Sequence, residues 1–300
     1  MHEGQRKTIS GRELMAAPVF YLLRVLLFPL TAIGYLILTG KAMLTGRGSG
    51  VSVTAQRPLS VRWFMHRLGT RPDEASTQLL MALPGVSPLG VRLVTGPLLL
   101  AHRLTGFVPS AFRYPFEGDI PKQHEASARV TFFDAAVERH LADVDQFVML
   151  GAGFDTRAFR LYREARVQSF EVDAPKTQAI KREMVKKAGI DLAGVRFVSA
   201  DFAKEDWLSR LVDTGFDPGK PALFLWEGVV PYLDRGAIEG TLRTIAGVAS
   251  GSVVAFDYFT TEPLCTQSFY WRFARAAHPW QRDRPGAGMG WLRNCIREVS

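Results

Sequence analysis

The sequence predicts an α/β fold with a doubly wound, mostly parallel sheet, preceded by an apolar helical extension at the N-terminus. Short apolar runs of strand length occur at residues 147–150, 167–172, 195–199, 222–226 and 252–258. Amphipathic stretches of helical character separate these runs and begin near Asp155, Lys176, Glu205 and Arg235. Strands that alternate with helices form a parallel sheet with helices on both faces. A further amphipathic helix, at 127–141, precedes the first strand.

The composition is that of a globular protein with a buried core: 300 residues, 47% hydrophobic and 22% charged. The two cysteines, Cys265 and Cys295, lack CxxC spacing, so neither a disulfide framework nor a metal site is expected. Residues 1–60 hold seven Lys/Arg against two Asp/Glu, whereas residues 131–260 hold sixteen against nineteen. A basic flank beside apolar sequence favours an anionic membrane surface, and we expect no nucleic-acid partner.

The N-terminal part, residues 1–50, contains a strongly apolar segment at 14–44. Arg24 interrupts this segment and Lys41 ends its uncharged run, which is shorter than the roughly 20 apolar residues of a membrane span. The segment is therefore predicted to contact a membrane surface, and the alternatives of a true span or a helix packed on the core stay open. We expect a cytoplasmic protein, associated with the inner face of the membrane if residues 14–44 bind lipid.

A Gly/Ser-rich linker at 45–52 leads into a second region, 51–124, which is expected to form a helical cap or lid. Its apolar stretch, 79–108, is punctuated by Pro84, Pro88 and Pro97. This punctuation predicts several short helices in place of one long helix. The remaining residues, 125–300, are expected to form the core domain.

A glycine turn and an acidic residue mark the start of a nucleotide site. The first strand runs into Gly151 and Gly153, which allow a sharp turn and a close backbone approach to a ligand. The second strand ends at Asp173, at the distance where a carboxylate accepts hydrogen bonds from ribose hydroxyls. A dinucleotide turn has a third glycine where this chain has Thr156. Asp155 beside the turn would repel a pyrophosphate but suits a cationic sulfonium, which favours S-adenosylmethionine over NAD. The alternative that Asp155 pairs with Arg157 across the turn stays open.

Four motifs in order resemble those of the leucine carboxyl methyltransferase-like family: LGAGFDTRAFRL, FEVDAP, VSADF with EDW shortly after, and LWEGVVPYL. The family includes protein-phosphatase carboxyl methyltransferases and bacterial O-methyltransferases, and the similarity runs from about residue 126 to 258. The resemblance implies the Rossmann-like sheet of class I S-adenosylmethionine methyltransferases, with S-adenosylmethionine as cofactor and a small-molecule methyl acceptor.

The resemblance also implies the residues that bind the cofactor. Arg129 would bind its carboxylate, and Gly151 with Gly153 would cradle the methionine part. The ribose would be held by Asp173, the adenine by Asp201 and Phe202, and the amino group would lie near Glu227. No catalytic base is evident: Tyr232 is a candidate pocket-lining residue, and His124 and His140 have the character of surface residues.

Two other functions remain open at this point, a nicotinamide-dependent oxidoreductase on a similar sheet and a membrane-associated binding protein that has lost catalysis. A carboxylate or acidic hydroxyl is the favoured methyl acceptor, because an ionised carboxylate needs no general base. The apolar segments suggest that the substrate is lipophilic. Residues 260–300 show no convincing hairpin, so the end of the sheet is expected to be irregular or missing. The oligomeric state is left open.

Overall fold

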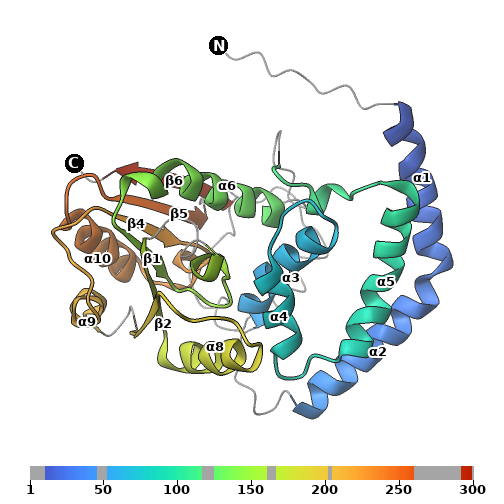
Figure 1. The fold of residues 1–300 in the computed structure, drawn as a ribbon, viewed down its shortest axis with the longest axis horizontal. Coiled ribbons are helices and arrows are strands. Elements are labelled where there is room, and N and C mark those ends of the chain that lie inside the picture. Colours follow the sequence, from blue (N-terminus) through green and yellow to red (C-terminus); the bar gives the residue numbers. More distant parts are fainter. Residues whose placement is uncertain are drawn as a thin grey trace. The chain divides into compact units, whose positions relative to one another are not determined.

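The structure is a computed structural model, and it describes residues 11–45, 53–116, 125–160, 167–201, 205–259 and 292–298 (Figure 1). Contacts divide the chain into two compact units. Unit 1 comprises residues 1–131, 153–164 and 175–194, and unit 2 comprises residues 132–152, 165–174 and 195–300. The division expected from the sequence, into 1–50, 51–124 and 125–300, remains a prediction.

Unit 2 contains a six-stranded sheet in the order β3-β2-β1-β4-β5-β6. The strands are β1 (Gln146–Leu150), β2 (Gln168–Asp173), β3 (Val195–Ser199), β4 (Ala222–Trp226), β5 (Val253–Phe259) and β6 (Leu292–Glu298). The first five are parallel to one another, so the predicted doubly wound α/β fold is confirmed. Strands β1 and β4 are buried along their whole length, as expected of central strands in a parallel sheet.

The last strand corrects one expectation. The end of the sheet was expected to be irregular or missing, yet β6 pairs antiparallel with the full length of β5. Its sequence, LRNCIRE, does not alternate cleanly between apolar and polar residues. Backbone hydrogen bonds to β5 hold the strand, and any residue other than proline can make them. The apolar pattern of the sequence therefore gave little indication of a strand here.

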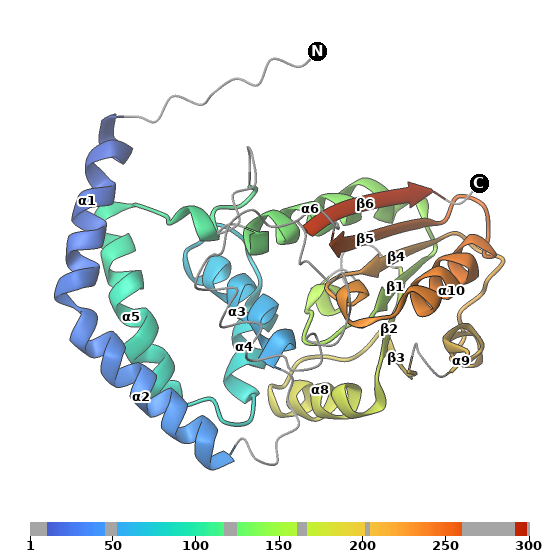
Figure 2. The ribbon, with the colours of Figure 1, turned by 180° about the vertical axis from the view of Figure 1, so that it is seen from behind.

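One face of this sheet is covered by α9 (Trp207–Asp213) and α10 (Arg235–Ala246), which Figure 2 shows on the same side of the strands. Asp206 and Asp234 cap these helices by accepting the backbone N–H groups of Ser209 and Ala237. The shared core includes Phe170, Val172, Trp207, Leu211, Phe224, Trp226 and Ile245. Burying these side chains fixes the strands, and with them the carboxyl edge of the sheet.

Unit 1 is mainly helical. It contains α1 (Gly11–Leu26), α2 (Phe28–Thr45), α3 (Val53–Arg67), α4 (Glu74–Ala82), α5 (Pro88–Thr105), η1 (Ser110–Phe112) and α8 (Pro175–Lys187). The helix α6 (Glu125–His140) begins in unit 1 and continues into unit 2. Phe20 of α1, Leu68 after α3, and Leu98 and Ala101 of α5 form a small buried cluster.

The stretch 79–108 is divided between the end of α4 and α5, as expected, but Pro97 does not break α5, which is therefore longer than expected. Pro88 lies in the first turn, where its missing N–H costs nothing, and Ser87 caps that end through the N–H of Gly90. Pro97 lies within the helix and is buried. Packing of the inner face of α5, rather than its local helix propensity, decides its length.

No single helix in the described ranges is long and apolar enough to cross a membrane. Two consecutive segments, Met15–Leu26 and Phe28–Lys41, pass the same test only when taken together, and they are bent by 58° at the break between them.

Candidate functional site

Four predicted site residues meet at the carboxyl edge of the sheet in unit 2. Gly151 follows β1, Asp173 ends β2, Asp201 lies two residues beyond β3, and Glu227 follows β4. These strands are adjacent and parallel, so their carboxyl ends lie at one edge. Ligands of open α/β sheets bind at this edge, next to the point where the strand order reverses, here between β1 and β4.

Gly151 allows two turns to lie in contact. Its φ is +69°, and its N–H donates to the carbonyl of Val172 at 2.7 Å. A Cβ atom at this position would overlap the side chain of Val229, in the turn after β4. Glycine is required both by the left-handed backbone and by this close approach.

We expect Gly151→Ala to lower the free energy of unfolding by about 2–4 kcal/mol, as the sum of left-handed strain and overlap with Val229. Gly69→Ala is the matched control, because Gly69 has a φ of +72° and nothing within 4 Å of its Cβ position. That variant should lose about 1 kcal/mol. Adding Val229→Ala to Gly151→Ala should restore part of the loss in denaturant unfolding; equal losses at both glycines would contradict the assignment.

Asp173 and Asp201 lie side by side at the ends of neighbouring strands. The Asp173 side chain accepts the N–H of Ala174 at 2.7 Å, and its backbone carbonyl accepts the N–H of Ala200 at 3.0 Å. The carbonyl of Asp201 accepts the N–H of Glu205 at 2.9 Å. Both aspartates are partly exposed.

A buried carboxylate that the sequence analysis missed supports the turn beside Glu227. Asp257, on β5, is fully buried and accepts the N–H of Gly228 at 2.8 Å. Gly228 has a φ of +70°, so this contact holds a tight turn between Glu227 and Val229. The sequence feature that could have indicated this role is the single carboxylate within the apolar strand VVAFDYF. A carboxylate is buried only when it has hydrogen-bond partners, so its position predicts such a partner nearby.

The structure does not place the other predicted residues at this edge of the sheet. Arg129, on α6, and Gly153 belong to unit 1, so their roles toward the same cofactor stay predictions. Phe202 and His124 lie outside the described residues. Tyr232 ends η4 (Val230–Tyr232) with its side chain 45% exposed, and its role in lining a pocket remains a prediction. 

The segment after the glycine turn is held in unit 1 by a buried ion cluster. The Asp155 carboxylate lies 2.6 Å from Arg157 Nη1 and 3.1 Å from Arg62 Nη1, and it accepts the backbone N–H of Arg157 at 2.7 Å. Burial by itself would raise the pKa of Asp155, but the two guanidinium groups and this hydrogen bond hold the pKa well below its usual range.

This cluster corrects the expected role of Asp155. Asp155 was expected to favour a cationic cofactor, but its charge is buried and balanced by two arginines of the same unit. The preference for S-adenosylmethionine must therefore rest on other residues. Asp155 instead anchors the segment after the glycine turn to α3, which carries Arg62.

A second buried contact fixes the same segment to α4. Thr156 donates its hydroxyl to Asp73 at 2.8 Å, and Asp73 is paired with Arg71 at 2.6 Å. Asp73 also caps α4 by accepting the N–H of Ser76. Thr156, found where a dinucleotide turn has its third glycine, therefore has a structural partner 83 residues away in the chain.

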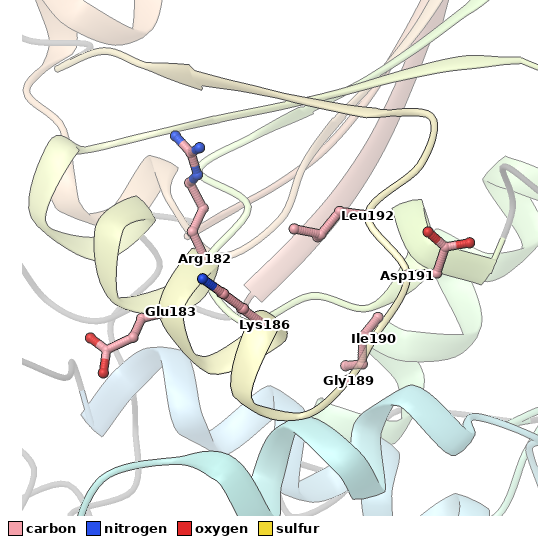
Figure 3. A pocket seen from close by; sticks show the side chains of 7 residues that line it. All are labelled: Arg182, Glu183, Lys186, Gly189, Ile190, Asp191 and Leu192. Atoms are coloured by element: carbon pink, nitrogen blue, oxygen red, sulfur yellow. The ribbon is translucent and has the colours of Figure 1, made fainter.

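A surface hollow lies elsewhere in unit 1, at the C-terminal end of α8 (Figure 3). Its lining includes Arg182, Glu183, Lys186 and Asp191, and none of the predicted site residues. In the described part of the chain, no group of three or more His, Cys, Asp or Glu side chains is arranged to hold a metal ion.

The comparisons agree with this architecture. The family model described as leucine carboxyl methyltransferase matches residues 120–246. A putative S-adenosyl-L-methionine-dependent methyltransferase of Mycolicibacterium smegmatis is 32% identical over 211 residues, which are 70% of this chain and 67% of that protein. A protein of the same description from Mycolicibacterium paratuberculosis is 40% identical over 132 residues.

That second alignment covers 43% of this chain and 44% of its relative, so the chain matches less than half the length of several curated relatives. Among solved structures, an O-methyltransferase family protein from Burkholderia thailandensis is 16% identical, with a TM-score of 0.33 over 52% of this chain and 48% of that one. A likeness this small says nothing about substrate.

A parallel sheet in the order β3-β2-β1-β4-β5, closed by an antiparallel edge strand and carrying acidic residues at its strand ends, defines a class I methyltransferase fold of the Rossmann-like type. The chain belongs to the leucine carboxyl methyltransferase family.

Proposed function

We propose that this chain is an S-adenosylmethionine-dependent methyltransferase. The observation that carries the proposal is the row of Gly151, Asp173, Asp201 and Glu227 at the carboxyl ends of four adjacent parallel strands. The residues present fit the cofactor: Asp173 and Asp201 are partly exposed at the strand ends, and carboxylates suit hydroxyl and amino groups. The relatives described as putative methyltransferases support the same activity.

When bound, S-adenosylmethionine supplies a methyl group on a sulfonium for an in-line displacement. Asp173 would accept hydrogen bonds from the ribose hydroxyls, and Asp201 would contact the adenine. Glu227 would balance the charge of the amino group, with its turn held by Asp257. These side chains would bind and orient the cofactor, so that a bound acceptor reacts with it as in an intramolecular reaction.

For the acceptor, we propose a carboxylate or an acidic hydroxyl of a lipophilic small molecule. Such a nucleophile is ionised or nearly so at neutral pH, so the enzyme needs to align it and exclude water rather than deprotonate it. The extensive apolar surface of α1, α2 and α5 supports a lipophilic substrate.

Calorimetric titration of the full chain with S-adenosylmethionine, S-adenosylhomocysteine and NADH tests the proposal. We expect both sulfur compounds to bind with micromolar or tighter affinity, and NADH to give no heat of binding. Binding of NADH alone would reject the proposal in favour of a nicotinamide-dependent enzyme. Binding of none of the three would reject it as well.

A further inference from the structure

The helices α1, α2 and α5 of unit 1 carry a large exposed apolar surface. They lie side by side, with α1 and α2 following one another along α5 (Figures 1 and 2). We call their exposed apolar side chains the helical apolar surface: Met15, Val19, Tyr21, Leu22, Val25, Leu26, Phe28, Leu30, Ile33, Tyr35, Leu36, Met43, Leu44, Leu89, Leu100 and Leu104. Large amounts of exposed apolar surface on a folded protein mark interaction sites.

The packing of α2 explains why so much of it is exposed. A Cβ atom at Gly34 would overlap the backbone of Val94 and the side chain of Leu93, and a Cβ atom at Gly90 of α5 would overlap the side chain of Leu38. These glycines bring the two helices close along one narrow strip. Outside that strip α2 remains apolar, with Leu36 72% and Leu44 88% exposed. A helix that is apolar all round is normally covered by protein or lipid.

The charged residues of the three helices are almost all basic. Their sequences contain a single acidic residue, Glu13. Lys41 is exposed at the end of α2, and Arg92 and Arg103 are exposed on α5, on the same side of that helix as Leu89, Leu100 and Leu104. Lipid bilayers that contain acidic lipids offer both an apolar layer and negative charge to such a surface.

We propose that the helical apolar surface docks on an anionic lipid bilayer, with the helices lying in the interface rather than across the membrane. The sequence pointed to residues 14–44 alone; the structure adds the outer face of α5. A spanning arrangement is disfavoured because Met15–Leu26 and Phe28–Lys41 are bent by 58° and Arg24 lies within the apolar stretch. The opposite face of α5, with Val91, Thr95 and Leu98, is buried within unit 1.

A second copy of the chain suits the surface less well. In a two-fold dimer the same patch faces itself, so Arg92 and Arg103 would meet cations and the partner would supply no carboxylate beyond Glu13. Charge complementarity therefore favours acidic lipid over self-association.

Vesicle co-sedimentation of the full chain tests this inference, with phosphatidylcholine vesicles compared with vesicles that also contain phosphatidylglycerol. We expect strong binding to the mixed vesicles, weakened by added salt. The double variant Arg92→Glu/Arg103→Glu should bind the mixed vesicles about tenfold or more weakly. The matched charge reversal Arg182→Glu/Lys186→Glu, on α8, should bind like wild type.

A second variant tests the apolar contribution. Leu22→Ser/Leu36→Ser should lower vesicle binding by about tenfold or more. Both side chains are more than half exposed, so the substitutions remove contacts with lipid and not contacts within a core. Val212→Ser, an exposed apolar residue of α9, is the matched control and should bind like wild type. Unchanged thermal unfolding of each variant excludes misfolding as the cause.

Three results would overturn the proposal. The first is a failure to bind mixed vesicles, and the second is binding that neither double variant weakens. The third is a stable dimer in gel filtration that Leu22→Ser/Leu36→Ser dissociates, which would assign the surface to a second copy. None of these results depends on cofactor binding, so docking and the proposed activity can fail separately.

Discussion

Replacing Asp173 by alanine is expected to lower the affinity for S-adenosylmethionine by about a hundredfold or more. Hydrogen bonds to a charged group contribute about 1.5–3 kcal/mol each, and a ribose offers two hydroxyls to this carboxylate. Asp173→Asn is the more informative variant, because its amide oxygen can still accept the N–H of Ala174 and keep the turn. It should weaken binding less than alanine does, and calorimetry measures both.

The control for this prediction is Asp191→Asn, at the surface hollow beside α8. That substitution should leave the affinity unchanged. If Asp191→Asn weakened binding while Asp173→Ala did not, the cofactor site would lie at the hollow, and the assignment to the carboxyl edge of the sheet would be wrong.

Asp155→Asn is expected to lower the free energy of unfolding by about 3–5 kcal/mol, because it leaves Arg62 and Arg157 as buried charges without their shared carboxylate. Glu239→Gln is the matched control. Glu239 also contacts two arginines, Arg235 at 2.7 Å and Arg243 at 3.1 Å, but on the exposed surface of α10. Because this pair is exposed to solvent, its loss should have little effect in the same denaturant titration. Equal costs for the two substitutions would refute a structural role for the buried cluster.

The same cluster predicts an acid dependence of stability. The pKa of Asp155 is lowered in the folded state from an ordinary value of 3.8, so its contribution is fully present above that value. The contribution is lost as the pH falls from about 4 toward the depressed folded pKa. Wild type should therefore lose stability more steeply than Asp155→Asn below pH 4, and parallel curves would contradict this.

Much of the sheet and part of the site were predictable from local patterns. Each parallel strand is a short apolar run between amphipathic stretches, and residues such as Asp173 and Glu227 follow such runs directly. Because parallel strands share an edge, strand-end positions in the sequence become neighbours in space. The C-terminal strand β6 and the continuous helix α5 were not predictable, since backbone pairing and tertiary packing outweigh their local sequence signals.

The sequence by itself determined the α/β fold, the family and the position of the glycine turn with its carboxylates. Only the tertiary structure decided what Asp155 does, because its partner Arg62 lies far away in the chain and becomes a neighbour on folding. Tertiary contacts also identified Asp257 as the support of the Gly228 turn and left the outer face of α5 exposed beside α2. Helices and strands can be predicted from the apolar periodicity of residues that are close in sequence. The pairing of a buried charge cannot, because it depends on groups that come together only in the folded chain.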